Sequence, residues 1–218
     1  MPGSFAQFTR GIGLLRKRGV PFAMKGIIFR TTAGKREKLR SWIKRQTGAE
    51  PEIVMMLDLR HRHDSPARND VIRCLRLRPD QAASIICADP LFRKQMKQFP
   101  ARYMGAQGAK LFTCSAGKSV CLDAYGRLQP CLLLRKKELS FDLRQGTLRQ
   151  ALIKFFPTAL SITPRRKQYL ARCAQCRLKG FCSQCPARSY IEHGVLDKPV
   201  EYLCKVAHQQ AALLGWKE

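Results

Sequence analysis

Hydrophobic and polar positions along the first sixty residues alternate between helical spacing and short continuous apolar runs. A first helix is predicted by apolar residues three and four positions apart, namely Phe5, Phe8, Ile12 and Leu15. Two apolar runs, residues 24–30 and 52–58, predict buried strands, and residues 35–46 between them predict a second helix. The order helix, strand, helix, strand is typical of βα units, so we expect a parallel sheet.

Glycine residues mark the expected ends of both helices. Gly19 follows the basic end of the first helix and Gly48 follows the second, at positions where helices commonly terminate in a left-handed residue. In the second helix, the apolar side chains that we expect to face inward are Leu39, Trp42 and Ile43. Two more helices are predicted, one from Pro79 and a short basic one from Pro90 to about Pro100.

A polar stretch, residues 60–69, predicts a loop between these elements. Two histidines and a carboxylate in it form a set that can bind a metal ion, although such a set is more typical of a solvated loop: His61, His63 and Asp64. Cys74 and Cys87 follow without the spacing of metal ligands, so we expect them to be buried thiols.

The second half of the chain has a different pattern. Apolar runs on both sides of Gly126, within residues 119–134, predict a β-hairpin whose turn needs the positive φ of glycine. Thr147 is the expected N-cap of a helix over residues 148–155, and a last helix is predicted over residues 200–214.

Composition places this chain among globular proteins. It has 218 residues, 45% of them hydrophobic, which suffices for one large or two small domains. A shift to Gly, Ala and Gln at residues 103–110 suggests a boundary, so we expect domains over residues 1–105 and 106–218. Apolar runs are too short for a membrane span, and the N-terminus opens into an amphipathic segment rather than a signal sequence. We therefore expect a cytoplasmic protein, in which ten cysteines serve as ligands or buried thiols rather than disulfides.

The net charge of +26 is the most unusual bulk property. Such a charge favours nucleic acid or an acidic peptide as partner. Lys and Arg are spread along the whole chain, however, which is equally typical of a generally basic surface. The densest group, residues 35–40, has helical spacing and is expected to be a solvated helix face.

Seven cysteines have the spacing of metal ligands. Two Cys-x-x-Cys pairs lie within thirteen residues, Cys173 with Cys176 and Cys182 with Cys185. Each pair places two thiolates on one tight turn, which suits a tetrahedral thiolate site. Three more cysteines lie outside this run, at Cys114, Cys131 and Cys204. Zinc and iron–sulfur clusters both accept four cysteines, so the residue types do not choose between these metals.

The whole spacing is similar to a known family pattern. Cys114 and Cys131 with Gly126 between them, the Cys173–Cys185 run, and then Cys204 resemble the SPASM extension of radical S-adenosylmethionine enzymes. The sequences Cys114-Ser-Ala-Gly-Lys-Ser and Leu122-Asp-Ala-Tyr-Gly126 also resemble the family's first-ligand loop and hairpin turn. The resemblance covers about residues 111–214. It implies an α/β chain, with the remnant of a partial (β/α) barrel followed by a small, cysteine-rich α+β SPASM-like domain.

The resemblance implies two auxiliary [4Fe–4S] clusters. The first would be held by Cys114, Cys131 and Cys185, and the second by Cys173, Cys176, Cys182 and Cys204. Cys121 is either the fourth ligand of the first cluster or a small buried residue on a hairpin strand. In intact members, a separate catalytic cluster cleaves S-adenosylmethionine, and the radical abstracts hydrogen from a peptide or protein. The auxiliary clusters transfer electrons or bind substrate.

This sequence departs from the family pattern in several places. The Cys-x3-Cys-x2-Cys motif of the catalytic cluster is absent, since no cysteine precedes Cys74. Two residues separate Cys182 from Cys185 where three are commoner. Leu132 stands where sulfatase-maturing members have an aspartate, which disfavours that activity. Three further side chains lie near the expected sites: Asp123, His193 and His208. Asp123 could act as an acid or base and the histidines could tune a cluster by hydrogen bonding. Such residues are, however, more typical of ordinary structural or exposed positions.

We therefore expect the C-terminal portion of a radical enzyme, as a fragment, a split gene product or a late start, that is inactive alone. Its expected partners are a peptide or protein substrate and a missing N-terminal radical half, with no membrane. Its expected cofactors are the two clusters, with S-adenosylmethionine only in the complete enzyme. The alternative is a zinc-binding, strongly basic protein that binds nucleic acid.

Overall fold

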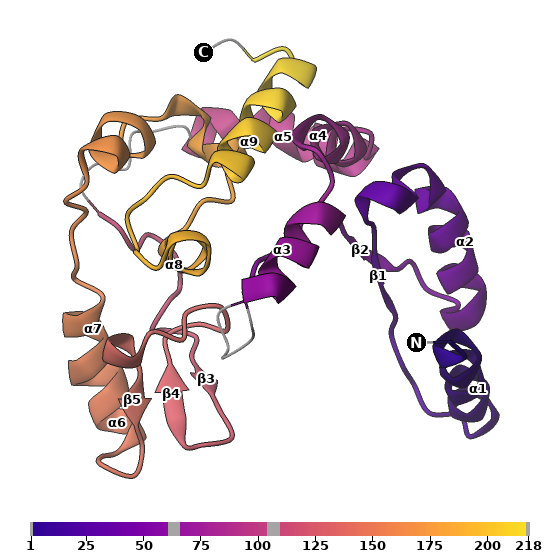
Figure 1. Ribbon diagram of the computed structural model, residues 1–218, viewed down its shortest axis with the longest axis horizontal. Helices are drawn as coiled ribbons and strands as arrows, with labels where there is room; N and C mark the ends of the chain where they lie inside the picture. Colours follow the sequence, from indigo (N-terminus) through magenta and orange to yellow (C-terminus); the bar gives the residue numbers. More distant parts are fainter. Residues whose placement is uncertain (1, 61–65, 104–109, 217–218) are drawn as a thin grey trace. The chain divides into compact units, whose positions relative to one another are not determined.

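The computed structural model describes residues 2–60, 66–103 and 110–216 (Figure 1). The chain divides into two compact units, the first formed by Met1–Leu57 with Cys74–Leu77 and the second by Asp58–Arg73 with Arg78–Glu218. Helices and short strands occur in both units, so the fold is mixed α and β. The domain boundary predicted between residues 105 and 106 lies outside the described residues.

The first unit contains the predicted helix–strand order. Its elements are α1 (Ser4–Lys17), β1 (Lys25–Ile27), the 3₁₀ helix η1 (Arg30–Lys35), α2 (Arg36–Thr47) and β2 (Glu52–Val54). β1 and β2 pair in parallel, which confirms the predicted parallel sheet, although each strand has three residues and is shorter than expected. A Cβ atom on Gly26 would lie 2.8 Å from Ile53 and 2.9 Å from Leu39, so glycine is what lets α2 pack directly on β1.

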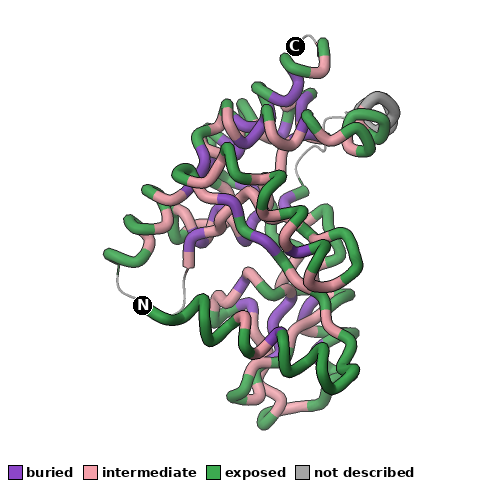
Figure 2. The backbone as a smooth tube through the Cα atoms, turned by 90° about the vertical axis from the view of Figure 1, so that its right-hand side faces the viewer, coloured by how far each residue is buried: buried purple, intermediate pink, exposed green. Residues whose placement is uncertain are grey.

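Both predicted helix ends are confirmed, because Gly19 and Gly48 have φ angles of 64° and 73°. The inward face predicted for α2 is confirmed only in part, because Ile43 is buried while Leu39 and Trp42 are half-buried. In α1, Ile12 is buried, whereas Phe5 and Phe8 are exposed, as the green N-terminal helix in Figure 2 indicates. The rings of the two phenylalanines lie tilted against that of Trp42 on α2, and more than half of each side chain remains exposed to solvent.

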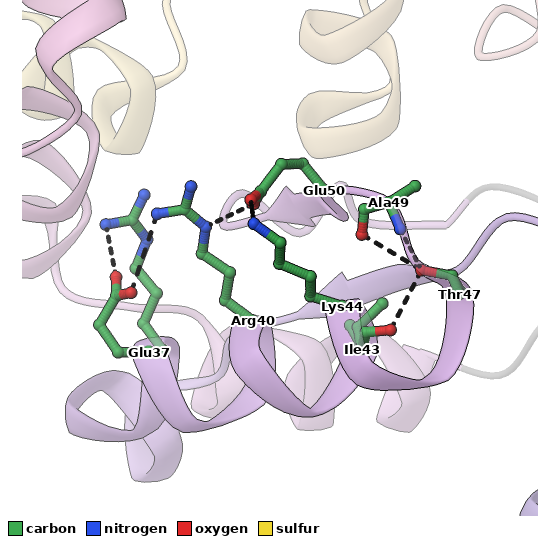
Figure 3. A network of polar contacts seen from close by, with 8 residues as sticks. Glu37, Arg40, Ile43, Lys44, Thr47, Ala49 and Glu50 are labelled. Carbon is green, nitrogen blue, oxygen red and sulfur yellow. Dashed lines mark hydrogen bonds and ion pairs between the residues drawn. The ribbon is translucent and has the colours of Figure 1, made fainter.

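The exposed side of α2 carries an ion-pair network (Figure 3). Glu50 accepts hydrogen bonds from Arg40 at 2.8 Å and Lys44 at 2.6 Å, while Glu37 pairs with Arg36 and Arg40. Lys44 and Arg40 hold the pKa of the Glu50 carboxyl below its usual value. This network ties the loop after α2 back to the helix on a surface exposed to solvent.

Helix α3 (Pro66–Leu75) corrects two predictions. Its first residues, 66–69, lie inside the segment predicted to be a loop, because Pro66 is well suited to the first helical position. Cys74 is exposed rather than buried, since it lies on the solvent side of this helix. The candidate metal ligands His61, His63 and Asp64 lie outside the described residues.

In the second unit, three helices pack together. Helix α4 (Pro79–Cys87) lies along α9 (Glu201–Leu213), and the basic helix α5 (Pro90–Tyr103) continues past Pro100, where it was predicted to end. The predicted buried thiol of Cys87 is confirmed, and its Sγ lies 4.0 Å from the Gln210 carbonyl oxygen. Burial raises the pKa of this thiol.

The predicted hairpin is confirmed, and it belongs to a three-stranded antiparallel sheet. Strands β3 (Cys121–Leu122), β4 (Arg127–Gln129) and β5 (Phe141–Asp142) pair in this order, and the last was not predicted. Gly126 has a φ of 77°. Asp123 accepts hydrogen bonds from the Tyr125 and Arg127 amides, so it stabilises the turn.

The predicted N-cap at Thr147 is also confirmed. Its hydroxyl accepts from the Gln150 amide at 3.2 Å, while the Gln150 side chain accepts from the Thr147 amide at 2.7 Å. One helical segment follows as α6 (Leu148–Gln150), the π-helix η3 (Ala151–Phe155) and α7 (Phe156–Ala159). The remaining elements are η2 (Lys137–Leu139), η4 (Tyr169–Cys173), η5 (Arg177–Phe181) and α8 (Pro186–His193). No helix in the described ranges is long and apolar enough to cross a membrane.

Leu134 tests the core under this cysteine-rich unit. It is fully buried with Leu139 and Ala187. We expect Leu134→Ala to lower the free energy of unfolding by about 2–5 kcal/mol, because it removes methyl groups and leaves a cavity. Leu132→Ala is the control, since Leu132 is 59% exposed and its loss should change stability by less than about 0.5 kcal/mol. Urea unfolding followed by circular dichroism measures both; equal effects would contradict this assignment of the core.

Candidate metal centre

Four cysteines line one cavity of about 450 Å³ in the second unit. They are the four residues assigned to the second cluster by resemblance: Cys173, Cys176, Cys182 and Cys204. The cavity is many times larger than the volume of about 30 Å³ that one water molecule occupies in the liquid. Leu178, Pro199 and Val200 supply apolar parts of its wall. The fold therefore gathers four sulfur atoms around one bulky space.

Short helical turns position three of these sulfurs. Cys173 is the last residue of η4, and Cys176 and Cys182 are the residues immediately before and after η5. Cys204 lies in the first turn of α9 and lines the same cavity. The Cys173–Cys176 pair thus places both of its thiols at one cavity, as its spacing predicts. The other pair divides, because Cys182 lines this cavity and Cys185 does not.

An apolar group holds η5 against α9. Leu178 and Phe181 of η5 pack with Ala207 and Ala211 of α9, and Cys176 and Cys182 pack against this group. Phe181 also contacts Trp216, with ring centroids 6.2 Å apart. The small side chains on α9 allow the turn to approach the helix closely. The cavity is therefore supported by ordinary hydrophobic packing.

Cations surround the sulfurs. Arg172, Arg177 and Lys179 all line the cavity. Arg172 donates two hydrogen bonds to Glu201, at 2.6 and 3.1 Å, and its other contact is with Cys204 Sγ at 3.7 Å. These contacts raise the pKa of Arg172. Positive charge beside the sulfurs favours thiolates, which are the form that binds metals.

Burial disfavours the thiolate form of two of these cysteines. It raises the pKa of Cys173 to about 11 and that of Cys182 to about 12, and the neighbouring sulfur of Cys204 adds to both shifts. Burial also lowers the pKa of Lys179. Four thiolates crowded in this cavity would thus repel one another, and a bound cationic group would relieve that repulsion.

Two cysteines assigned to the first cluster also lie near each other. Cys131 and Cys185 both pack against the buried side chains of Leu134, Leu139 and Ala187. Cys185 is the N-cap of α8, and its Sγ accepts from the Arg188 amide at 3.5 Å. Burial raises the pKa of the Cys185 thiol, and the hydrogen bond from the Arg188 amide at the start of α8 acts against this rise. None of the first-cluster cysteines lines the cavity described above.

Cys114 is exposed, and its loop is fixed beside the approach to Cys131. The Gly117 amide donates to the Pro130 carbonyl at 2.9 Å. Gly117 has a φ of 78°, and a Cβ atom there would lie 2.7 Å from Leu160. Glycine is therefore required for this close approach.

Cys121 lies on β3 directly opposite Gln129 of β4 and is half-buried. This position is compatible with both roles considered for Cys121, a ligand or a small strand residue.

An ion pair that sequence reasoning missed connects α8 to residue 58. Asp58 accepts from Arg188 Nε at 2.8 Å, and the two side chains are only 27% and 22% exposed. Arg188 also donates to the Ser183 carbonyl at 2.8 Å. Arg188 thus holds the loop between Cys182 and Cys185. The pair spans 130 residues, so no local pattern could indicate it.

The remaining candidate side chains have different surroundings. His208 lines the cavity. The Nε2–H group of His193 donates a hydrogen bond to the Pro199 carbonyl oxygen, 3.1 Å away. Hydrogen bonds from the Arg127 and Tyr125 amides hold the pKa of Asp123 below its usual value, which fits the turn role.

No protein-family model matches this chain, and no curated protein matches it either. Among residues 2–60, 66–103 and 110–216, no three His, Cys, Asp or Glu side chains are gathered as one metal ion would need. The cysteine arrangement itself is therefore the basis for any assignment of function.

The Asp58–Arg188 pair predicts a large loss of stability in Asp58→Ala. Removing the carboxylate leaves a mostly buried guanidinium without its counter-charge, so we expect a loss of about 2–4 kcal/mol. Asp70→Ala removes one partner of the exposed Asp70–Arg73 pair and should cost at most about 1 kcal/mol. Urea unfolding of both variants gives the comparison, and equal losses would contradict a supporting role for Arg188.

Thiol reactivity provides a second test. In the metal-free, reduced protein at pH 8, we expect iodoacetamide to modify exposed Cys74 and Cys114 at least about tenfold faster than Cys182, because thiolates react and burial disfavours that form. The Cys182 rate should rise by about tenfold per pH unit until the pH approaches about 12. Peptide mapping by mass spectrometry gives the individual rates. Fast modification of Cys182 at pH 8 would contradict its burial.

Proposed function

We propose that this chain holds two auxiliary [4Fe–4S] clusters, as the SPASM extension of a radical S-adenosylmethionine enzyme does. The observation that carries this proposal is the grouping of Cys173, Cys176, Cys182 and Cys204 around one cavity. The family resemblance assigns the same four residues to one site. Residues 106–218 would be the SPASM-like domain, and residues 1–105 the remnant of a partial (β/α) barrel.

The donor set and the space both fit a cluster. Thiolates are the usual ligands of iron–sulfur clusters and also of structural zinc. A single zinc ion at 2.3 Å from each sulfur would draw the four sulfurs to within about 3.8 Å of one another. Each thiolate of a [4Fe–4S] cluster binds a different iron, so the sulfurs stand around a larger body. The cavity of about 450 Å³ that the cysteines line has room for this second arrangement.

The residues around the cavity have identifiable tasks in this proposal. Arg172, Arg177 and Lys179 would offset the negative charge of four thiolates, and Leu178, Pro199 and Val200 would restrict water. Arg172 would contribute a hydrogen bond to the Cys204 sulfur. A cluster bound here supplies one-electron chemistry, at a potential that depends on charge, hydrogen bonds to sulfur and solvent access.

Cys114, Cys131 and Cys185 would hold the other cluster, with Cys121 as fourth ligand or with one position open for substrate. Arg188 would support both sites, because it donates to Cys185 through its amide and to the Ser183 carbonyl through its side chain. Two sites joined by the loop between Cys182 and Cys185 would suit electron transfer between them.

The reaction would require residues that this chain lacks. The sequence contains no Cys-x3-Cys-x2-Cys motif, so radical formation from S-adenosylmethionine would depend on a separate N-terminal half. The substrate would be a peptide or protein. A net charge of +26 would favour an acidic one through long-range attraction.

Metal analysis after anaerobic reconstitution tests the assignment. Brown protein absorbing near 400 nm, with about eight irons per chain, is the expected result for two four-iron sites. Cys176→Ala and Cys204→Ala should each lower the iron content by about four and destabilise the second unit, because metal binding is coupled to folding. Cys74→Ala is the matched control, since Cys74 is exposed on α3, and it should keep all of the iron.

Colourless protein with stoichiometric zinc would support a zinc site and overturn the cluster assignment. Full iron content in Cys176→Ala and Cys204→Ala would show that the ligands are misassigned. Loss of about four irons in Cys74→Ala would show that Cys74 is a ligand and that the ligands of the first cluster are misassigned.

A further inference from the structure

A second feature lies in the first unit, far in sequence from the cysteine sites. Residues 1–57 carry twelve Lys and Arg against three Glu, and the first acidic residue of the chain is Glu37. Helices α1 and α2 supply most of these cations, and both present exposed surface (Figure 2). The unit therefore has a strong positive charge of its own.

The three glutamates of residues 1–57 form ion pairs with cations of the same unit. Glu52 pairs with Lys25 at 2.8 Å, and Figure 3 shows Glu37 and Glu50 paired with cations of α2. None of these pairs includes Lys38 or Arg45, which are exposed on the same helix. The acidic residues thus fix one side of α2 and leave the charge of these two side chains uncompensated.

Aromatic rings lie beside these cations. Phe5 is 64% exposed and Phe8 is 51% exposed, and their ring centroids lie 5.7 and 6.3 Å from that of Trp42. Lys38 and Arg45 are four residues before and three after Trp42, so they share its face of α2. We call this surface the aromatic–basic face: Phe5, Phe8, Trp42, Lys38 and Arg45.

We propose that the aromatic–basic face binds single-stranded nucleic acid. Lys38 and Arg45 would contact backbone phosphates, and the open faces of Phe5 and Phe8 would stack on unpaired bases. This combination of cations with exposed rings is how sequence-tolerant single-strand binding is achieved. Unpaired bases are needed because a duplex hides the faces of its bases.

A lipid surface fits the same residues less well. An interfacial helix sinks one continuous apolar stripe into the membrane. In α1 that stripe is interrupted, because Ile12, which shares the side of Phe5 and Phe8, is buried within the unit. Leu14 is exposed on the opposite side of the helix. The apolar surface that remains is a small aromatic platform with flanking cations.

Fluorescence of the full chain tests this proposal directly. The chain has two tryptophans, Trp42 and Trp216, so Trp216→Phe leaves Trp42 as the only one. We expect oligo(dT) and oligo(U) of about twelve nucleotides to quench its emission, with affinity that falls as salt rises. The affinity for these oligonucleotides should fall at least about fivefold in Phe5→Ala, and by a similar factor in Phe8→Ala, because stacking contributes roughly 1 kcal/mol or more per base.

The charge contribution has its own readout. Lys38→Gln with Arg45→Gln should reduce the slope of log affinity against log salt by about 0.7 per lost phosphate contact. Lys154→Gln with Lys167→Gln removes the same charge from exposed sites in the second unit and should leave the slope unchanged. Leu14→Ala is the control for apolar surface on α1 and should bind normally. Phe5→Tyr keeps a stacking ring and should restore binding, which separates stacking from any loss of folding.

Several results would overturn the proposal. Oligonucleotides that leave Trp42 emission unchanged would show that this face does not bind them. Equal slope changes for the two charge pairs would show diffuse attraction to the whole basic chain. Binding to vesicles of phosphatidylglycerol and phosphatidylcholine that depends on Leu14, without oligonucleotide binding, would identify a membrane surface. The metal content does not enter these readouts, so they are independent of the cluster assignment.

Discussion

The second unit depends on one constraint, which is that four half-buried cysteines share a cavity. Buried thiolates without compensating charge are unfavourable, and the raised pKa values of Cys173 and Cys182 express that cost. Arg172 and Lys179 beside the sulfurs offset part of it. The surrounding chain has little regular structure of its own, so the apolar contacts between η5 and α9 must maintain the cavity.

A second dependence links the two sets of cysteines. Cys182 faces the cavity, and three residues later Cys185 caps α8 and packs on another core. The loop between them is held by Arg188, which is itself fixed by Asp58. A substitution at Asp58 should therefore alter the position of both Cys182 and Cys185, although Asp58 lies far from them in sequence.

Local features of this fold could be predicted from the sequence. The turn at Gly126, the cap at Thr147 and the ends of α1 and α2 each depend on a few adjacent residues. The turn and the caps are short-range effects that the residue types determine by themselves. The four cysteines that share a cavity were grouped by the resemblance to a family pattern, since spacing alone pairs Cys182 with Cys185, which lies outside that cavity.

Features that depend on distant residues could not be predicted. β5 forms only because β4 offers it an edge, and the Asp58–Arg188 pair joins residues 130 positions apart. Exposure was misjudged at Cys74 for the same reason. Phe5 and Phe8 share the helical spacing of buried Ile12, yet they remain mostly exposed beside Trp42. Helical spacing shows which residues share a face, and the packing partner decides whether that face is buried.

The net charge of +26 is therefore not one property. Around the cysteines, Arg172, Arg177 and Lys179 line the same cavity as the sulfurs, and under the proposed function the thiolates there would be their internal counterpart. In the first unit, the glutamates neutralise cations on one side of α2, and Lys38 and Arg45 have no such counterpart among the ion pairs there. Positive charge without an acidic partner in the protein, such as that of Lys38 and Arg45, is what attracts an external polyanion. Where the cations lie thus says more about partners than their total does.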